Sequence, residues 1–275
     1  MARKSWLYTV VGIRATGVVL MILMGIVAAF CLQIAVGKDW HFSRTGLKIR
    51  QGWMQILVIV LNLDIKRYGR ASSKPTLIAS NHISWIDILV IGASTPCAFV
   101  AKQNVQAWPL IGNLAQMAGT VFVDRENRRN AMDSMSSITR FLEKGCSVVV
   151  FPEGTTSVGA EVQTFHRLLF EAAVRGKYNT QAAALYYPGN MQDTSVVPFV
   201  DEDAFGPHLI GLLAAGKIRA EIYFCGKIVH NEEITRKELA ETTQKQIEHV
   251  LQHREVQHSQ QADNTLVSFQ TRPLM

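Results

Sequence analysis

Apolar residues are spread unevenly along the 275-residue chain. Two long apolar stretches lie near its start, and beyond them short apolar runs alternate with longer amphipathic ones. No charged residue occurs from Ala15 to Gly37, and a helix of that length, rising ~1.5 Å per residue, can cross a hydrocarbon core of ~30 Å. The second stretch, at 52–63, is too short to span and has basic residues on both sides, which favours a helix at the membrane interface.

These stretches predict that residues 1–70 anchor the chain to a membrane. Segment 15–37 either crosses the bilayer or forms, with the helix at 52–63, a re-entrant hairpin that dips into one leaflet. A signal peptide is the rival interpretation, because basic residues precede the first run. The run is longer than a usual signal-peptide core and no clear small-x-small cleavage site follows it, so a retained helix is favoured.

The pattern changes after a turn-rich linker at 71–75. Short apolar runs predict strands at 76–80, 97–101, 120–124, 146–151, 182–187, 195–200 and 219–225. Amphipathic segments predict helices at 84–93, 105–117, 128–144 and 161–175. Strands that alternate with helices are typical of an α/β fold, so we expect a mixed central sheet flanked by helices over residues 74–232. A polar helix at 233–256 and a flexible tail at 257–275 complete the prediction.

Charge and cysteine content narrow the range of partners. The 28 Lys and Arg residues exceed the 22 Asp and Glu residues, giving a net charge of +6. A basic balance suits an anionic membrane surface, an acidic protein, a phosphorylated substrate or nucleic acid. Nucleic acid is disfavoured, since no basic stretch is interleaved with aromatic residues and the apolar segment would have no part in it. The 4 cysteines show no C-x-x-C pair, which predicts reduced thiols rather than a zinc site or disulfides.

One apolar run ends in Asn81-His82, and Asp87 follows within the next run. On a regular helix five residues turn through ~500°, so His82 and Asp87 would point ~140° apart if both were helical. They meet only if His82 lies in a strand-to-helix loop, and Ser84 is a good N-cap that places Asp87 in a capping box. There the carboxylate can accept a hydrogen bond from one ring nitrogen and leave the other as a base. The alternative is that Asp87 only caps the helix and His82 is an ordinary loop residue.

A cluster of arginines follows the strand predicted at 120–124. Arg125 comes first, and Arg128 and Arg129 follow it closely. Guanidinium groups at a strand end suit a phosphate or a carboxylate, which they can bind bidentately. The alternative is a solvated basic turn before a helix.

The wholly apolar strand predicted at 146–151 is expected to be central in the sheet. It breaks at Pro152 and is followed by Glu153, Gly154 and Thr155. Gly154 permits an unusual backbone or the close approach of a substrate, and free N–H groups in such a turn can bind an anion. The alternative is an ordinary turn with a solvated glutamate.

Three blocks of these residues occur in a fixed order: His-x-x-x-x-Asp at 82–87, Gly-x-x-Phe-x-x-Arg at 119–125 and Phe-Pro-Glu-Gly-Thr at 151–155. The order and spacing resemble those of the glycerolipid acyltransferase family over about residues 74–190. The segment FVAKQNV, between the first two blocks, is also similar to that family.

The resemblance implies transfer of a fatty acyl group from a thioester to the hydroxyl of a lysolipid. It implies that His82 is the general base and that Asp87 orients it, so that the substrate supplies the hydroxyl and no nucleophile of the enzyme is needed. The donor would be acyl carrier protein or coenzyme A, with no resident cofactor and no metal. The residues that the resemblance implies in substrate binding are Arg125, Lys102, Gly119, Phe122, Glu153, Gly154 and Thr155.

The chain departs from the family pattern after the third block. A proline usual in the fourth block is replaced by Ala182 or Ala183 in TQAAALYYPG, although Pro198 offers a second alignment. The aromatic pair Tyr186-Tyr187 at the end of this block is interpreted as strand packing. These departures concern the acceptor: 1-acyl-glycerol-3-phosphate, giving phosphatidate, is expected, and a lyso-ornithine lipid is the alternative. An alternative of another class is a catalytically inactive, membrane-anchored lipid-binding protein.

The expected partners are membrane lipids and acyl carrier protein or acyl-CoA, without nucleic acid. The expected location is a bacterial inner membrane, with the active domain facing the cytoplasm.

Overall fold

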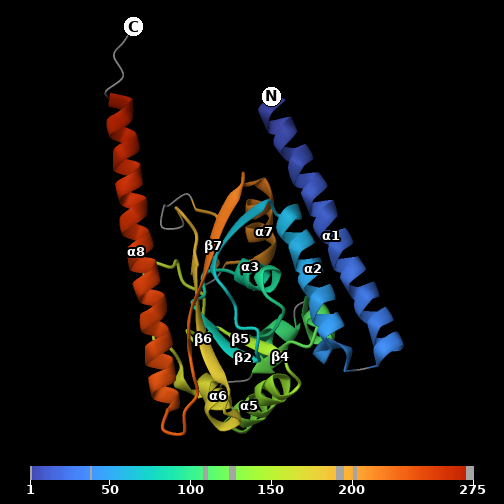
Figure 1. Ribbon diagram of the computed structural model, residues 1–275. Helices are drawn as coiled ribbons and strands as arrows, with labels where there is room; N and C mark the ends of the chain where they lie inside the picture. Colours follow the sequence, from blue (N-terminus) through green and yellow to red (C-terminus); the bar gives the residue numbers. More distant parts are fainter. Residues whose placement is uncertain are drawn as a thin grey trace.

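The computed structural model describes residues 2–37, 39–107, 111–123, 128–189, 195–200 and 203–270. Within these ranges a seven-stranded sheet forms the centre of the molecule (Figure 1). Its strands are β1 (Leu63–Gly69), β2 (Thr76–Ser80), β3 (Cys97–Lys102), β4 (Val121–Val123), β5 (Ser147–Val150), β6 (Asn179–Tyr186) and β7 (Ile218–Ile228). The strand order is β1-β7-β6-β2-β5-β3-β4, and only the pair β6–β7 is antiparallel. The predicted mixed α/β fold is confirmed.

Helices cover both faces of the sheet (Figure 1). The described helices are α1 (Ala2–Val36), α2 (Arg44–Val60), α3 (Ile86–Ser94), α4 (Ile111–Met117), α5 (Arg128–Glu143), α6 (Glu171–Gly176), α7 (Phe205–Ala214) and α8 (Arg236–Gln270), with the short 3-10 helices η1 (Trp40–Phe42), η2 (Gln103–Ala107) and η3 (Arg167–Phe170). Helices α2, α3 and α7 lie on one face with α1 outside them, and α5, α6 and α8 lie on the other. Each face therefore has its own apolar core.

The central strands are buried on both sides because their residues are apolar throughout. All five residues of β2 and all four of β5 are buried. Side chains alternate between the two cores, so that Ile78 and Val149 pack on the α3 side while Leu77 and Val148 pack on the α8 side. A run without polar alternation therefore predicts a central parallel strand, as it does here.

The N-terminal helices α1 and α2 form a hairpin that packs along the domain (Figure 1). Helix α1 contacts α2, α4 and α7, and its buried side includes Val18, Met21 and Ala29. Trp53 of α2 lies over Gly25 and donates its indole N–H to the carbonyl oxygen of Met21 at 2.8 Å. The helix expected at 52–63 to lie at the interface is thus longer and starts earlier, and one of its sides is part of the protein core.

A buried arginine joins this hairpin to the sheet. Arg50 of α2 is 8% exposed and donates to the carbonyl oxygens of Cys97 and Ala118. The next residue after Ala118 is Gly119, whose φ is +79° and where a Cβ atom would lie 2.6 Å from Cδ2 of His41 in η1. The turn before β4 is therefore shaped by close contact with η1, which connects the two helices and is called the hairpin elbow below.

Several element predictions were wrong. Strand β1 was missed, so the sheet begins before residue 74, because this exposed edge strand carries charged side chains instead of an apolar run. Helix α7 was also missed, and residues 195–200, predicted as a strand, are a loop. Helix α8 continues through Gln270 into the segment expected to be a flexible tail.

Candidate active site

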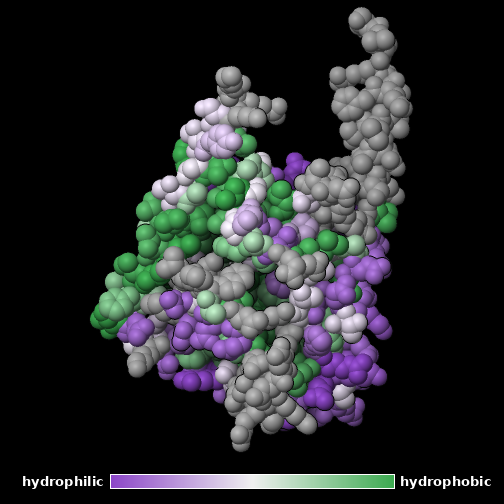
Figure 2. All heavy atoms as spheres, turned by 180° about the vertical axis from the view of Figure 1, so that it is seen from behind, coloured by the Kyte–Doolittle hydropathy of each residue, from purple (hydrophilic) through white to green (hydrophobic). Residues whose placement is uncertain are grey.

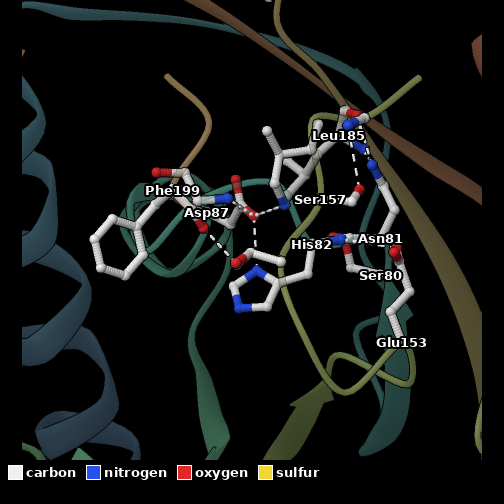
Figure 3. A network of polar contacts seen from close by, with 12 residues as sticks. Ser80, Asn81, His82, Asp87, Glu153, Ser157, Leu185 and Phe199 are labelled. Atoms are coloured by element: carbon white, nitrogen blue, oxygen red, sulfur yellow. Dashed lines mark hydrogen bonds and ion pairs between the residues drawn. The ribbon is translucent and has the colours of Figure 1, made fainter. Parts of the chain in front are cut away.

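The carboxyl ends of β2 and β5 lie side by side, and the residues that follow them form one polar network (Figure 3). His82 follows β2 in a loop, and its Nδ1 lies 2.8 Å from Oδ2 of Asp87 in the first turn of α3. The predicted contact between the two side chains is confirmed. The His82 side chain is 18% exposed, whereas Asp87 is fully buried.

The loop is folded around the carboxylate of Asp87. Oδ2 also accepts hydrogen bonds from the backbone N–H groups of Ile83 at 2.7 Å and Ser84 at 2.9 Å. The second bond is one half of the predicted capping box. The other half does not form: the helix begins at Ile86, and the buried hydroxyl of Ser84 has no hydrogen-bond partner among the described residues.

Two neighbouring strands hold His82 in place. Phe151, at the end of β5, stacks on the imidazole ring with 3.9 Å between centroids and 14° between planes. Asn81, just before His82, bonds through its side-chain amide to both the N–H and the carbonyl oxygen of Leu185 in β6, at 2.8 and 3.0 Å. These contacts fix the backbone on one side of the histidine and the ring plane on the other.

Glu153, in the turn after β5, is hydrogen-bonded to the same loop. It is 5% exposed; Oε1 accepts from the backbone N–H of His82 at 2.9 Å and Oε2 accepts from that of Gln163 at 3.3 Å. Burial raises the pKa of Glu153 from 4.5 to about 7, against the opposing effect of these two hydrogen bonds. The carboxylate thus faces the backbone that carries His82.

The turn after β5 is tied to two other loops. Gly154 has a φ of +78°, a conformation that favours glycine, and Thr155 beside it is exposed. The N–H of Ser157 donates to the carbonyl oxygen of His82 at 3.0 Å, and the Thr156 hydroxyl donates to the carbonyl oxygen of Phe199. The turn predicted after the strand is therefore present, and the structure places it beside His82.

Two of the remaining predicted residues, Gly119 and Phe122, belong to the segment that forms β4, which lies three strands from β2 in the sheet. Gly119 precedes β4 and packs on the hairpin elbow, whereas Phe122 is half-buried within that strand. Lys102 is the last residue of β3, but its side chain is outside the described part of the structure, and Arg125 lies wholly outside it. No group of three His, Cys, Asp or Glu residues that could hold a metal ion occurs in the described ranges.

One residue of the network was missed by sequence reasoning. Tyr187 is 1% exposed and donates its hydroxyl to Oδ1 of Asp87 at 2.6 Å. Its distance of 100 residues from Asp87 left no local signal. Only the parallel pairing of β2 with β6 brings the two residues together.

A histidine bonded to a buried carboxylate thus lies where β2 ends, in a domain against which an apolar helical hairpin packs. The sequence model of the family described as Acyltransferase matches residues 62–200, and the chain belongs to this family. The match begins at residue 62 and therefore includes β1.

Curated relatives carry two names. The lyso-ornithine lipid O-acyltransferase of Rhizobium meliloti is 30% identical over 84% of this chain and 84% of its own length. The enzyme of the same name from Pseudomonas aeruginosa is 32% identical over 73% of this chain and 77% of its own. The 1-acyl-sn-glycerol-3-phosphate acyltransferase of Neisseria gonorrhoeae is 34% identical over 53% of this chain and 57% of its own.

The fold also matches a solved structure. The crystal structure of the 1-acyl-sn-glycerophosphate (LPA) acyltransferase PlsC from Thermotoga maritima has a TM-score of 0.64 and 16% identity, and the match covers 92% of this chain and 97% of that one. The match extends beyond the α/β domain. Helix α1 contains a span, Ser5–Val36, that is long and apolar enough to cross a membrane, which fits a membrane anchor.

Proposed function

We propose that this enzyme transfers a fatty acyl group from an acyl thioester to the free hydroxyl of a lysolipid, with His82 as general base. The observation that carries the proposal is the bond between Nδ1 of His82 and the buried carboxylate of Asp87. This bond leaves Nε2 on the opposite edge of the ring as the basic nitrogen. It also stabilises the imidazolium that forms when Nε2 takes a proton.

The reaction then needs no nucleophile from the protein. As the acceptor hydroxyl oxygen attacks the thioester carbonyl carbon, its proton passes to Nε2 of His82. The tetrahedral intermediate collapses with cleavage of the C–S bond, and the leaving thiolate takes the proton back from the imidazolium. The ester and the free thiol are the products, and His82 returns to its starting state.

The donor is proposed to be acyl carrier protein or acyl-CoA. Both present the thioester on a pantetheine arm, and both are anionic, which suits a chain with a net charge of +6. No resident cofactor takes part in this scheme. Arg125 and Lys102 are proposed to bind the polar head of the acceptor, because cationic side chains suit a phosphate or carboxylate.

The acceptor favoured for this chain is a lyso-ornithine lipid. Two relatives of that name align over 84% and 73% of the chain, and the altered fourth block argues for an acceptor other than the usual one. The second candidate is 1-acyl-glycerol-3-phosphate, because the block that ends in Arg125 is retained and a relative with that activity in its name aligns over 53% of the chain.

The hairpin is proposed to lie in one leaflet instead of crossing the bilayer. Contacts with the domain run from Arg14, which donates to the carbonyl oxygens of Leu213 and Ala215, to the buried Ala29. The helix segments on either side of these contacts, residues 2–13 and 30–36, are ~18 Å and ~11 Å long at 1.5 Å per residue. Each is too short to cross a hydrocarbon core of ~30 Å.

The outer side of the hairpin supports this placement. Hydrophobic residues gather over the α1 side of the molecule (Figure 2). The exposed apolar side chains there include Val19, Leu23, Val27, Phe30 and Ile34 of α1, Ile56 and Ile59 of α2, and Ile210 of α7. We place this face in the cytoplasmic leaflet of a bacterial inner membrane, where acyl thioesters are available.

The test is an acceptor screen with one labelled acyl thioester in mixed micelles. Lyso-ornithine lipid, 1-acyl-glycerol-3-phosphate, glycerol 3-phosphate and lysophospholipids are compared side by side. His82→Ala should lower turnover about 10³-fold, within the usual range of general-base catalysis, with an unchanged melting temperature. His249→Ala, which removes an exposed histidine on α8, is the matched control and should keep wild-type turnover. Wild-type turnover by His82→Ala would contradict the mechanism.

A further inference from the structure

The two oxygens of the Asp87 carboxylate have different partners. Oδ2 accepts from Nδ1 of His82 and from two backbone N–H groups of the loop. Oδ1 accepts from the hydroxyl of Tyr187, at 2.6 Å. Rotation of the carboxylate about its Cβ–Cγ bond would break bonds on both oxygens at once. The tyrosine therefore acts as a second point of attachment from another strand.

The tyrosine is well suited to this position. Tyr187 follows β6, whose pairing with β2 brings it next to the loop, and it is 1% exposed. Burial, together with the neighbouring charge of Asp87, raises the pKa of Tyr187 well above its ordinary value. The hydroxyl therefore stays protonated and remains a donor throughout the pH range in which the enzyme works.

We propose that Tyr187 is a positioning residue of the catalytic pair, which acts on His82 through Asp87. The inference rests on the proposed role of His82 as general base. The altered fourth block, in which Tyr187 lies, thus supplies a donor to the relay instead of only packing the strand.

The hydroxyl has an electrostatic effect as well as a geometric one. Its positive end points at Asp87 and offsets part of the negative potential that the carboxylate exerts on the imidazole ring. The other titratable groups that face the loop are Glu153 from the turn after β5 and His208 from α7, which bonds to Trp85 at 3.0 Å. Neither has a hydrogen bond to Asp87 among the bonds described.

The test compares Tyr187→Phe with Tyr186→Phe. Loss of the Tyr187 hydroxyl should lower kcat about tenfold with little change in KM, because it loosens the orientation of the base. It should also move the acidic limb of the kcat/KM profile up by about half a pH unit, since the carboxylate then holds the proton on the ring more strongly. Tyr186 is buried on the other face of the sheet, under Arg254, and the matched variant should leave the pH profile unchanged.

A double-mutant cycle separates positioning from packing. If Tyr187 acts through Asp87, Tyr187→Phe should have little further effect on kcat in an Asp87→Asn background. An equal loss in both backgrounds, or a wild-type pH profile, would overturn the inference. If His82→Ala is inactive while Tyr187→Phe has the wild-type profile, only this inference fails. If His82→Ala keeps wild-type turnover, the proposed function fails first.

A second substitution keeps the test valid if Tyr187→Phe folds poorly. Replacing Tyr187 by 3-fluorotyrosine retains the ring and makes the hydroxyl a stronger donor. The acidic limb should then move to lower pH, opposite to the effect of Tyr187→Phe. A shift in the same direction, or none, would overturn the inference.

Discussion

Polar side chains in the N-terminal hairpin and at the catalytic edge of the sheet make different kinds of hydrogen bonds. In the hairpin, Arg14, Arg50 and Trp53 each donate to carbonyl oxygens of the main chain. At the catalytic edge, His82 and Tyr187 converge on the single carboxylate of Asp87. The first set attaches one part of the fold to another, whereas the second sets the position of the proposed general base.

Because the two sets of hydrogen bonds have different partners, we expect their removal to change different measured quantities. Removing a hairpin donor leaves buried carbonyl oxygens without a partner, so it lowers the free energy of unfolding. If Asp87 or Tyr187 of this converging set is replaced, the orientation and protonation of the proposed base His82 should change, and the rate should fall. The four predictions below test whether stability and rate separate in this way.

The largest effect is expected for Asp87→Asn. The amide cannot hold the imidazole as the carboxylate does, and kcat should fall about 10³-fold or more. Steady-state rates with a labelled donor measure this, with Asp64→Asn, at an exposed ion pair with Lys217, as the control that keeps the wild-type rate. A kcat within about tenfold of wild type would show that Asp87 stabilises the fold, as the hairpin residues do, without orienting the base.

The second effect concerns Arg50→Met, which should lower stability by about 2–4 kcal/mol by leaving two buried carbonyl oxygens without donors. The kcat of the folded enzyme should change less than about threefold, because no residue of the converging set is touched. Thermal unfolding in detergent measures the first quantity, and Lys48→Met, at an exposed position of the same helix, is the control. A large loss of kcat with an unchanged melting temperature would show that Arg50 affects the rate rather than the stability, contrary to the comparison.

Glu153 is the intermediate case, because it lies at the catalytic edge but bonds to main-chain N–H groups. Its pKa is raised in the folded chain from 4.5 to about 7, so between these values the folded state holds a proton that the unfolded state has lost. The free energy of unfolding should therefore fall by about 2–3 kcal/mol as the pH rises through this window.

The substitution Glu153→Gln removes this titration, so its stability should depend less on pH between 5 and 8. Melting temperatures at several pH values give the slope, and Glu161→Gln, in the exposed part of the same loop, should keep the wild-type slope. If the melting temperatures of Glu153→Gln and wild type depended equally on pH, the raised pKa of Glu153 would not be the cause of that dependence.

The smallest effect is expected for Gly119→Ala measured against Gly145→Ala. Both glycines have positive φ, of +79° and +87°, but only at Gly119 would a Cβ atom meet the ring of His41. Gly119→Ala should therefore be less stable by about 1 kcal/mol more than its partner variant. If Gly119→Ala instead raised the acceptor KM without a change in melting temperature, this residue would belong to the substrate site, as the family resemblance implies.

Local patterns predicted the centre of the sheet and the geometry of His82 and Asp87. Both depend on short-range rules: apolar runs for central strands, and loop placement with first-turn capping for the pair. Strand β1 was not predicted because most side chains of this edge strand are exposed. Its charged residues Asp64, Lys66 and Arg67 interrupt the apolar run by which a buried strand is recognised. The loop 195–200 looked like a strand, but its Pro198 has no N–H to donate to a neighbouring strand.

The parts of the site that could not be predicted depend on tertiary contacts. Nothing near Tyr187 in the sequence indicates a bond to a carboxylate 100 residues away, and a tyrosine beside another tyrosine is typical of strand packing. Glu153 was expected to face a substrate, and its inward orientation follows from the approach of the His82 loop. The role of Arg50 likewise depends on carbonyl oxygens in two other segments.

The bonds from Arg14 to the carbonyl oxygens at the end of α7 have a consequence for diffusion. In the proposed placement in one leaflet, these bonds and the packing of α1 hold the α/β domain against the membrane surface. A search for a lipid acceptor is thereby reduced from three dimensions to two, with His82 kept at one depth. The encounter rate is then governed by the surface density of the acceptor rather than by its concentration in solution.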